Sequence, residues 1–153
     1  MKAHLEEAFE ESVVEHLVSR GWLRGAASHY DRALGLDTAE LFAFIGATQA
    51  EAWEKLISLH GGANQAQQKF AKRLADELTT RGGVDVLRRG VKDLGVQVDL
   101  AYFAPAHDLT PDLRALYGAN RVSVTRQAAV AESNPQDTVD LLLGVNGVPV
   151  ATV

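Results

Sequence analysis

The 153-residue chain contains no cysteine, and this absence excludes three kinds of chemistry at once. A disulfide scaffold, a zinc site built from thiolates and a cysteine nucleophile all require the thiol group. The same absence suits a reducing compartment, so we expect a cytoplasmic protein. The chain also lacks an apolar run of membrane-spanning length, and the residues after Lys2, AHLEEAFEES, contain no apolar signal-peptide core. We therefore expect no membrane partner.

Positive charge is in the minority. The chain has 15 Lys and Arg against 20 Asp and Glu, which gives a net charge of -5. Nucleic-acid binding relies on clustered Lys and Arg, so the surface as a whole is not expected to be a nucleic-acid footprint. One stretch, residues 67–92, holds seven basic and three acidic side chains. This stretch could follow a DNA backbone or form an ordinary solvated helix face, and both interpretations stay open.

Familiar catalytic motifs are also missing. The sequence has no Walker A loop, no Gly-x-Ser-x-Gly elbow and no dinucleotide fingerprint. Its histidines share no close metal-ligand spacing, and we assign them no role. They are His4, His16, His29, His60 and His107.

Helical patterns dominate the first half. Over residues 4–20, apolar side chains recur about every four positions, which predicts a helix with one buried face. That face consists of Leu5, Phe9, Val13, Val14 and Leu17. The strings DTAE, from Asp37, and TQAE, from Thr48, are capping boxes that predict two further helices, the second ending at Gly61-Gly62. A longer helix is predicted over residues 63–80.

Strand patterns dominate the second half. The segments VQVDLAYF and RVSVTRQAAV alternate with a period of two, and TPDLRALY between them predicts a short helix. The segment DTVDLLLGVNGVPVATV predicts two strands, residues 140–145 and 148–153, joined at Asn146-Gly147. We therefore predict one α+β domain, residues 1–153, with its helical N-terminal half packed on a mixed β-sheet.

Asp140 is the acidic residue that the strand pattern explains least. Aspartate is disfavoured in an apolar strand, and it is costly if buried without a partner. One interpretation is a strand-end carboxylate that reaches water or a backbone amide. The other is a metal ligand, because neighbouring carboxylates can hold Mg²⁺ and its nucleophilic water.

A set of segments in the order FEESVVEHL, GW, YDRALGLD, AFIGATQAEAWEKL, DVLRRGVKDLGV, LAYFAPAHDL, LYGANRVSVTRQ and DTVDLLLGVNGVPVATV covers nearly the whole chain. In this order and spacing, the segments resemble the N-terminal part of the R subunit of type I restriction enzymes. The resemblance implies the start of a nuclease domain of the PD-(D/E)XK class, with Asp140 as a Mg²⁺-binding catalytic residue. It also implies that Glu-x-Lys follows the closing hairpin, so we expect the chain to stop immediately before these residues.

Glu10 is the second site residue that the resemblance suggests. In such nucleases an acidic residue on the first helix often approaches the metal, and Glu10 lies at the margin of the predicted buried face. Glu11 is a close rival. The alternative is a solvated acidic face, because five glutamates crowd this helix.

The resemblance also implies partners and a larger machine. The partners are double-stranded DNA and the modification and specificity subunits, and ATP is bound by a downstream motor region rather than by residues 1–153. The fragment alone is expected to be inactive. Two alternatives are a non-catalytic α+β module for docking or DNA binding, with Asp140 merely structural, and an unrelated acidic binding domain.

The expected metal site predicts the shape of the hairpin. A strict two-residue loop at Asn146-Gly147 would pair Asp140 with Val153, and the expected Glu would then face the opposite side of the sheet. Two ligands of one metal cannot be separated in that way. We therefore predict a longer loop or a bulge near Gly147 and Pro149.

Overall fold

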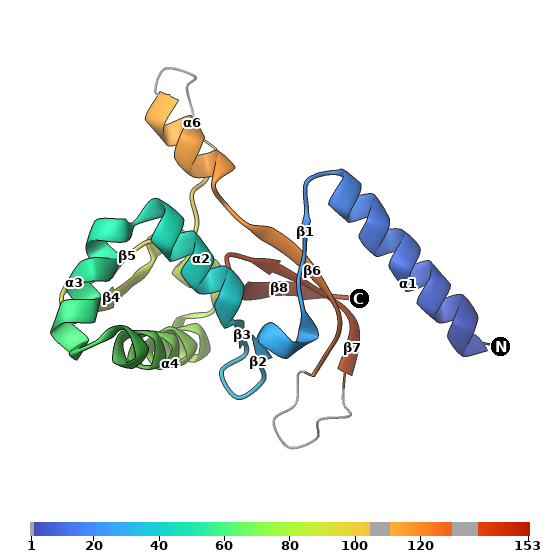
Figure 1. Ribbon diagram of the computed structural model, residues 1–153, viewed down its shortest axis with the longest axis horizontal. Coiled ribbons are helices and arrows are strands. Elements are labelled where there is room, and N and C mark those ends of the chain that lie inside the picture. Colours follow the sequence, from blue (N-terminus) through green and yellow to red (C-terminus); the bar gives the residue numbers. More distant parts are fainter. Residues whose placement is uncertain (1, 105–110, 130–137) are drawn as a thin grey trace.

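The computed structural model describes residues 2–104, 111–129 and 138–153. This part of the chain contains six α-helices and a mixed sheet, so the predicted α+β class is confirmed (Figure 1). The helices are α1 (Lys2–Ser19), α2 (Thr38–Thr48), α3 (Ala50–His60), α4 (Ala63–Arg81), α5 (Gly83–Arg89) and α6 (Pro111–Gly118). The strands are β1 (Leu23–Arg24), β2 (Tyr30–Asp31), β3 (Leu36–Asp37), β4 (Val91–Asp93), β5 (Val96–Val98), β6 (Val122–Ala129), β7 (Thr138–Val145) and β8 (Val148–Thr152).

The main sheet has the strand order β1-β6-β7-β8. Strand β1 runs parallel to β6, and the other neighbours are antiparallel. Helix α1 covers part of this sheet through a small core of Val14, Val124 and Leu141. The N-terminal residues of α1 extend away from the sheet (Figure 1).

A larger core lies among helices α2 to α5 and the β4–β5 hairpin. Phe44, Phe70 and Leu74 are fully buried in it, and Val148 joins it from the first position of β8. The helical half therefore meets the main sheet at the turn end of the β7–β8 hairpin. At that point the Asp37 amide donates to the Gly147 carbonyl at 2.9 Å.

The hairpin turn has the predicted two residues. Asn146 and Gly147 have φ angles of 52° and 84°, the left-handed conformation that a tight hairpin turn requires. Glycine is also needed for space, because a Cβ at Gly147 would lie 2.4 Å from the Asp37 carbonyl oxygen. The conformation of the turn thus depends on the backbone angles of Asn146 and Gly147 and on the close approach of Asp37 to Gly147.

One of the two predicted capping boxes forms in part. Asp37 caps α2 by accepting a hydrogen bond from the Glu40 amide at 3.1 Å, as predicted. The Glu40 side chain does not bond back, because it pairs with Arg121 at 2.7 Å. The predicted cap at Thr48 is wrong. Its hydroxyl donates to the Phe44 carbonyl within α2, and α3 follows Gln49 instead.

The other element predictions vary in outcome. The long helix is confirmed as α4, the end of α3 at Gly61 is confirmed, and α6 matches the predicted short helix. Strands β1, β2 and β3, which lie between the first two predicted helices, were not predicted, and neither was helix α5. These elements are two to seven residues long, and tertiary pairing rather than local pattern decides such short segments.

The predicted buried face of α1 is wrong in its first half. Val14 is fully buried, but Leu5 and Phe9 are 73% and 66% exposed. The reason is geometric, because the sheet supports only the C-terminal half of the helix in the described part of the chain. No helix in the described ranges is both long enough and apolar enough to cross a membrane.

Candidate functional site

Strand β8 contains the predicted bulge. Gly144 pairs with Pro149. The next pair is Leu143 with Ala151, so Val150 is the extra residue of a β-bulge. The turn itself has two residues and the pairing continues through Pro149, where the prediction placed the break, but the bulge follows at the next residue. It shifts the pairing of the rest of β8 by one residue, as predicted.

The structure brings Glu10 and Asp140 to the same groove. This shallow, open groove of about 240 Å³ is lined by Leu5, Glu6, Phe9, Glu10 and Asp140, and we call it the Glu10–Asp140 groove. Glu10 comes from the middle of α1, and Asp140 comes from the first half of β7. Two carboxylates that are 130 positions apart in the sequence thus face one hollow of the surface.

Glu10 is held by side chains of β6. It is only 7% exposed, so the alternative of a solvated acidic face does not apply to this residue. Arg126 Nη2 donates to Glu10 Oε2 at 3.0 Å, and Gln127 Nε2 donates to the same oxygen at 3.2 Å. These bonds compensate the desolvation of the Glu10 carboxylate. They also raise the pKa of Arg126 above its ordinary value, chiefly through the hydrogen bond to Glu10.

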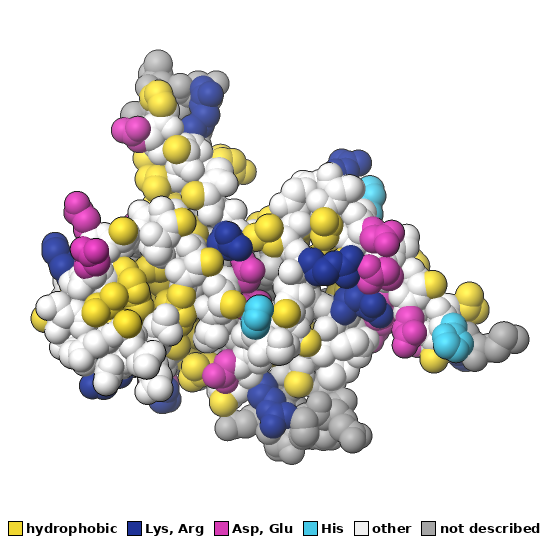
Figure 2. Space-filling model, in the orientation of Figure 1, with side chains coloured by type: hydrophobic (Ala, Val, Ile, Leu, Met, Phe, Trp, Pro, Cys, Tyr) yellow, Lys and Arg dark blue, Asp and Glu magenta, His cyan; other side chains and the backbone are white. Residues whose placement is uncertain are grey.

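Glu11, the rival of Glu10, is placed differently. It forms an ion pair with Arg24 at 2.6 Å and a second with Arg126 at 3.0 Å. The hydrogen bond from Arg24 holds the pKa of Glu11 below its ordinary value. Figure 2 shows acidic and basic side chains next to one another along the surface that α1 forms. Of the two glutamates, it is Glu10 that lines the groove with Asp140.

Asp140 remains available to a ligand. Its side chain is exposed, and no hydrogen bond or ion pair joins its carboxylate to the described residues. Exposure is compatible with both interpretations of the sequence, a solvated strand-end carboxylate and a metal ligand. Within the described ranges, no three His, Cys, Asp or Glu side chains come together as a set of metal ligands. The groove therefore provides two carboxylates of the oxygen type that Mg²⁺ prefers, and a complete site needs further donors.

The sequence analysis missed Arg126 and Gln127 as partners of Glu10. The sequence shows Arg126 and Gln127 inside RVSVTRQAAV, whose alternation predicts opposite faces for neighbouring residues. The structure shows both bonded to Glu10, because Gln127 has a left-handed backbone with φ of 55°. The charge of Arg126 within a half-buried strand was the signal that could have indicated a buried acidic partner.

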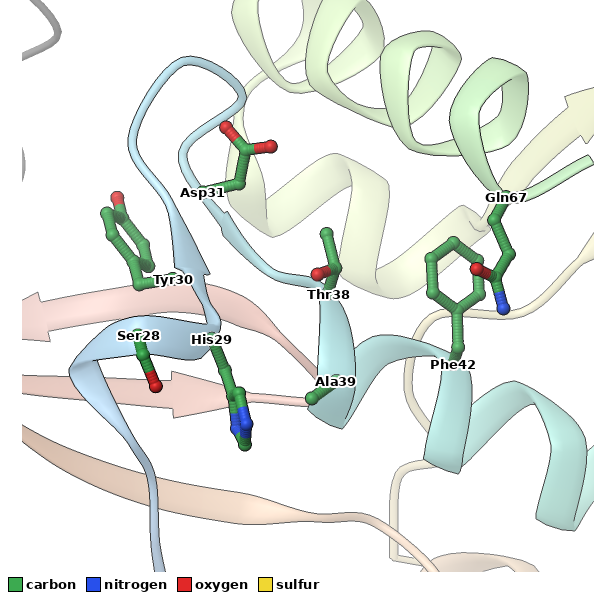
Figure 3. A pocket seen from close by; sticks show the side chains of 8 residues that line it. All are labelled: Ser28, His29, Tyr30, Asp31, Thr38, Ala39, Phe42 and Gln67. Atoms are coloured by element: carbon green, nitrogen blue, oxygen red, sulfur yellow. The ribbon is translucent and has the colours of Figure 1, made fainter. Parts of the chain in front are cut away.

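A larger hollow lies elsewhere, between the η1 turn (Ala27–His29), α2 and α4 (Figure 3). It measures about 520 Å³ and contains Ser28, His29 and Asp31 among its lining residues. Ser28 and His29 point away from Asp31 in Figure 3, and no hydrogen bond joins these three residues. The Asp31 carboxylate instead accepts from the Leu34 amide at 3.1 Å. This hollow does not assemble a nucleophile with a base.

The three acidic side chains of the basic stretch 67–92 pair with four of its seven basic side chains. Lys72 pairs with Asp76, and Arg81 pairs with both Glu77 and Asp85. Arg73 and Arg89 also have acidic partners within the stretch. Such exposed pairs on a helix contribute little stability, but they reduce the net field available to a phosphate backbone.

Comparisons of the chain with protein-family models, with curated proteins and with solved structures found no match. Function is therefore inferred from the residues and the geometry of the Glu10–Asp140 groove.

Proposed function

We propose that residues 1–153 are the N-terminal part of the nuclease domain of a type I restriction enzyme R subunit. The observation that carries the proposal is the meeting of Glu10 and Asp140 at one groove. A first-helix acid and a strand acid are the two carboxylates that the sequence resemblance to this family selects. The fold would then be the incomplete core of a PD-(D/E)XK nuclease, located in the cytoplasm.

The bulge in β8 supports this proposal. Leu141 and Val153 exchange both backbone hydrogen bonds, at 2.9 and 3.1 Å, so these two residues are directly opposite each other. A residue that follows Val153 in the same strand would lie opposite Asp140, and their side chains would share one face of the sheet. Without the bulge, the same residue would lie on the other face. A carboxylate at that position would complete the donor set that Glu10 and Asp140 begin.

The residues of the groove fit a hard divalent cation in type, since they offer carboxylate oxygens. Mg²⁺ bound there would stabilise charge on a phosphodiester and lower the pKa of an attacking water. Asp140 is exposed and free to contribute its oxygens, while Arg126 and Gln127 fix the Glu10 carboxylate. In the intact subunit, the substrate would be double-stranded DNA. An ATP-driven motor would follow in the same chain, and the modification and specificity subunits would be the protein partners.

A second candidate is a non-catalytic α+β module that docks a DNA-processing complex or binds DNA. The exposure of Leu5 and Phe9 on α1 favours this candidate, because large apolar side chains are often covered by a partner. Under this candidate, Asp140 is a solvated strand-end residue.

The source gene separates the two candidates. We expect its codons beyond Val153 to encode an acidic residue first and a lysine two positions later, because only the first position lies opposite Asp140. A stop codon at this point, or a continuation without a carboxylate, would favour the docking module.

A further inference from the structure

Asp37 has a buried oxygen atom without a partner. The residue is 6% exposed, and its Oδ1 atom caps α2 by accepting a hydrogen bond from the Glu40 amide. Its Oδ2 atom accepts no hydrogen bond from the described residues. A buried carboxylate oxygen without a hydrogen bond is costly, so native folds usually satisfy it with a protein group or with an ordered water molecule.

A small cavity adjoins this carboxylate. Its lining includes Asp37, Ser123, Thr125 and Gly144, and we call it the Asp37 cavity. Its volume of about 10 Å³ is close to the least that one water molecule needs, and it leaves no room for a larger ligand. Ser123 and Thr125 are each 3% exposed, and their hydroxyl groups can both donate and accept hydrogen bonds. The cavity is thus polar enough to hold water.

Asp37 Oδ2 and the Thr125 hydroxyl lie close together without bonding to each other. A Cβ atom at Gly25 would lie 3.5 Å from Asp37 Oδ2 and would overlap the Thr125 hydroxyl oxygen, so both oxygens border the same space. No hydrogen bond joins them. Polar groups that are neighbours but too far apart for a direct hydrogen bond are commonly bridged by a water molecule.

Gly144 keeps the cavity open. It lies inside β7, where glycine weakens a strand, and its φ angle is not in the left-handed region that would require glycine. A Cβ atom at this position would lie 3.1 Å from the Ser123 hydroxyl oxygen and 3.5 Å from the Val148 carbonyl oxygen. Any other residue would therefore fill the space beside Ser123. A glycine inside a strand often marks a place where another group approaches closely, and this one points to a small bound molecule.

We propose that the Asp37 cavity is a binding site for a single water molecule. The water donates one hydrogen bond to Asp37 Oδ2 and uses its remaining capacity on the hydroxyl groups of Ser123 and Thr125, which gives it the several polar partners that a buried water needs. It connects the cap of α2 to β6, beside the hydrogen bond from the Asp37 amide to the Gly147 carbonyl. The bound water is therefore part of the junction between the helical half and the main sheet.

This site is separate from the nuclease proposal, because none of its lining residues belongs to the Glu10–Asp140 groove. The test counts the long-lived internal water molecules of the 153-residue chain in solution by ¹⁷O relaxation dispersion. The method detects the oxygen of water, so the exchanging hydroxyl protons of serine and threonine do not contribute. In Gly144→Ala, the added methyl group takes the place of the water, and we expect the count to be one lower than in the wild type. A crystal structure of the wild type should show the water about 2.8 Å from Asp37 Oδ2.

Gly46→Ala is the matched control. It adds the same methyl group on the exposed side of α2, where a Cβ atom would meet nothing within 4 Å, so its water count should equal that of the wild type. Thr125→Val is the second variant, and it decides the question if Gly144→Ala does not fold. Valine keeps the shape of threonine but lacks the hydroxyl group, so the water should leave the cavity about three- to tenfold faster.

A count that is one lower in Gly144→Ala and unchanged in Gly46→Ala would support the water site. The same count in Gly144→Ala and the wild type would overturn it, and so would an exchange rate that Thr125→Val leaves unchanged. A crystal structure in which a protonated Asp37 bonds directly to the Thr125 hydroxyl would also overturn it. A free energy of unfolding that rises with Na⁺ but not with tetramethylammonium, in the wild type but not in Gly144→Ala, would assign the cavity to a cation instead.

Discussion

Substitutions of the two residues of the Glu10–Arg126 ion pair should reduce the stability of the fold by different amounts. Arg126→Met keeps most of the side-chain volume but leaves the Glu10 carboxylate with only the Gln127 amide as partner. Breaking a fully buried ion pair from one side costs about 3–5 kcal/mol. The side chains of Arg126 and Glu10 are 29% and 9% exposed, so water reaches the pair in part, and we expect a loss of about 2 kcal/mol for Arg126→Met.

Glu10→Gln should destabilise the fold less than Arg126→Met does. Arg126 would keep its ion pair with Glu11 at 3.0 Å, and a neutral amide in place of the carboxylate needs less compensation. We expect a loss of about 1 kcal/mol. The double mutant should lose about 1 kcal/mol less free energy of unfolding than the two single mutants together. The reason is that Arg126→Met alone leaves the Glu10 carboxylate without its ionic partner, whereas the double mutant has no carboxylate at position 10.

The assay is urea unfolding of the four proteins in a double-mutant cycle, followed by circular dichroism. For a chain of this size, Arg126→Met should lower the melting temperature by roughly 4–8 °C. Equal losses in the two single mutants, or losses that simply add in the double mutant, would refute the view that Arg126 compensates a buried Glu10.

Two further predictions concern the isolated chain. Purified residues 1–153 should neither nick supercoiled plasmid nor bind Mg²⁺ tightly in calorimetry, because Glu10 and Asp140 supply too few fixed oxygens and no basic group near the water; robust nicking that Asp140→Ala abolishes would contradict this. Burial raises the pKa of Asp37 above its ordinary value of 3.8, so the folded state binds a proton more tightly than the unfolded state, and stability is lost as the pH rises through the folded pKa. Asparagine at position 37 can still cap the helix, but it has no carboxyl group to ionise. In urea unfolding, Asp37→Asn and the wild type should therefore be about equally stable at pH 3, and the advantage of Asp37→Asn in free energy of unfolding should grow toward pH 7. A difference that does not change with pH would contradict the raised pKa of Asp37.

Local chemistry explains the parts of the fold that could be predicted. The Asn146-Gly147 turn, the Asp37 cap and the end of α3 at Gly61 each depend on a few adjacent residues with strong conformational preferences. The bulge beside Pro149 was expected on the hypothesis that Asp140 and a following carboxylate bind one metal and so share a face of the sheet. The sequence analysis selected Glu10 and Asp140, and the structure places both at one groove.

Contacts between distant segments explain the parts that could not be predicted. Strand β1 has two residues, and it exists because it lies beside β6, where Gly25 lets the chain approach Thr125 closely. The exposure of Leu5 and Phe9 depends on where the sheet ends beneath α1, which periodicity does not report. The roles of Arg126 and Gln127 depend on one left-handed residue in a strand whose pattern is otherwise regular.

The most direct test of the nuclease proposal is a paired assay on the full-length protein, assembled with its partner subunits on one supercoiled plasmid. ATP turnover and strand breakage are followed together for the wild type, for Asp140→Ala and for Asp76→Ala, an exposed carboxylate on α4 that serves as the control. We expect Asp140→Ala to abolish strand breakage and to leave ATP turnover nearly unchanged, while Asp76→Ala behaves as the wild type. Wild-type strand breakage by Asp140→Ala would contradict the assignment of Asp140 as a catalytic metal ligand.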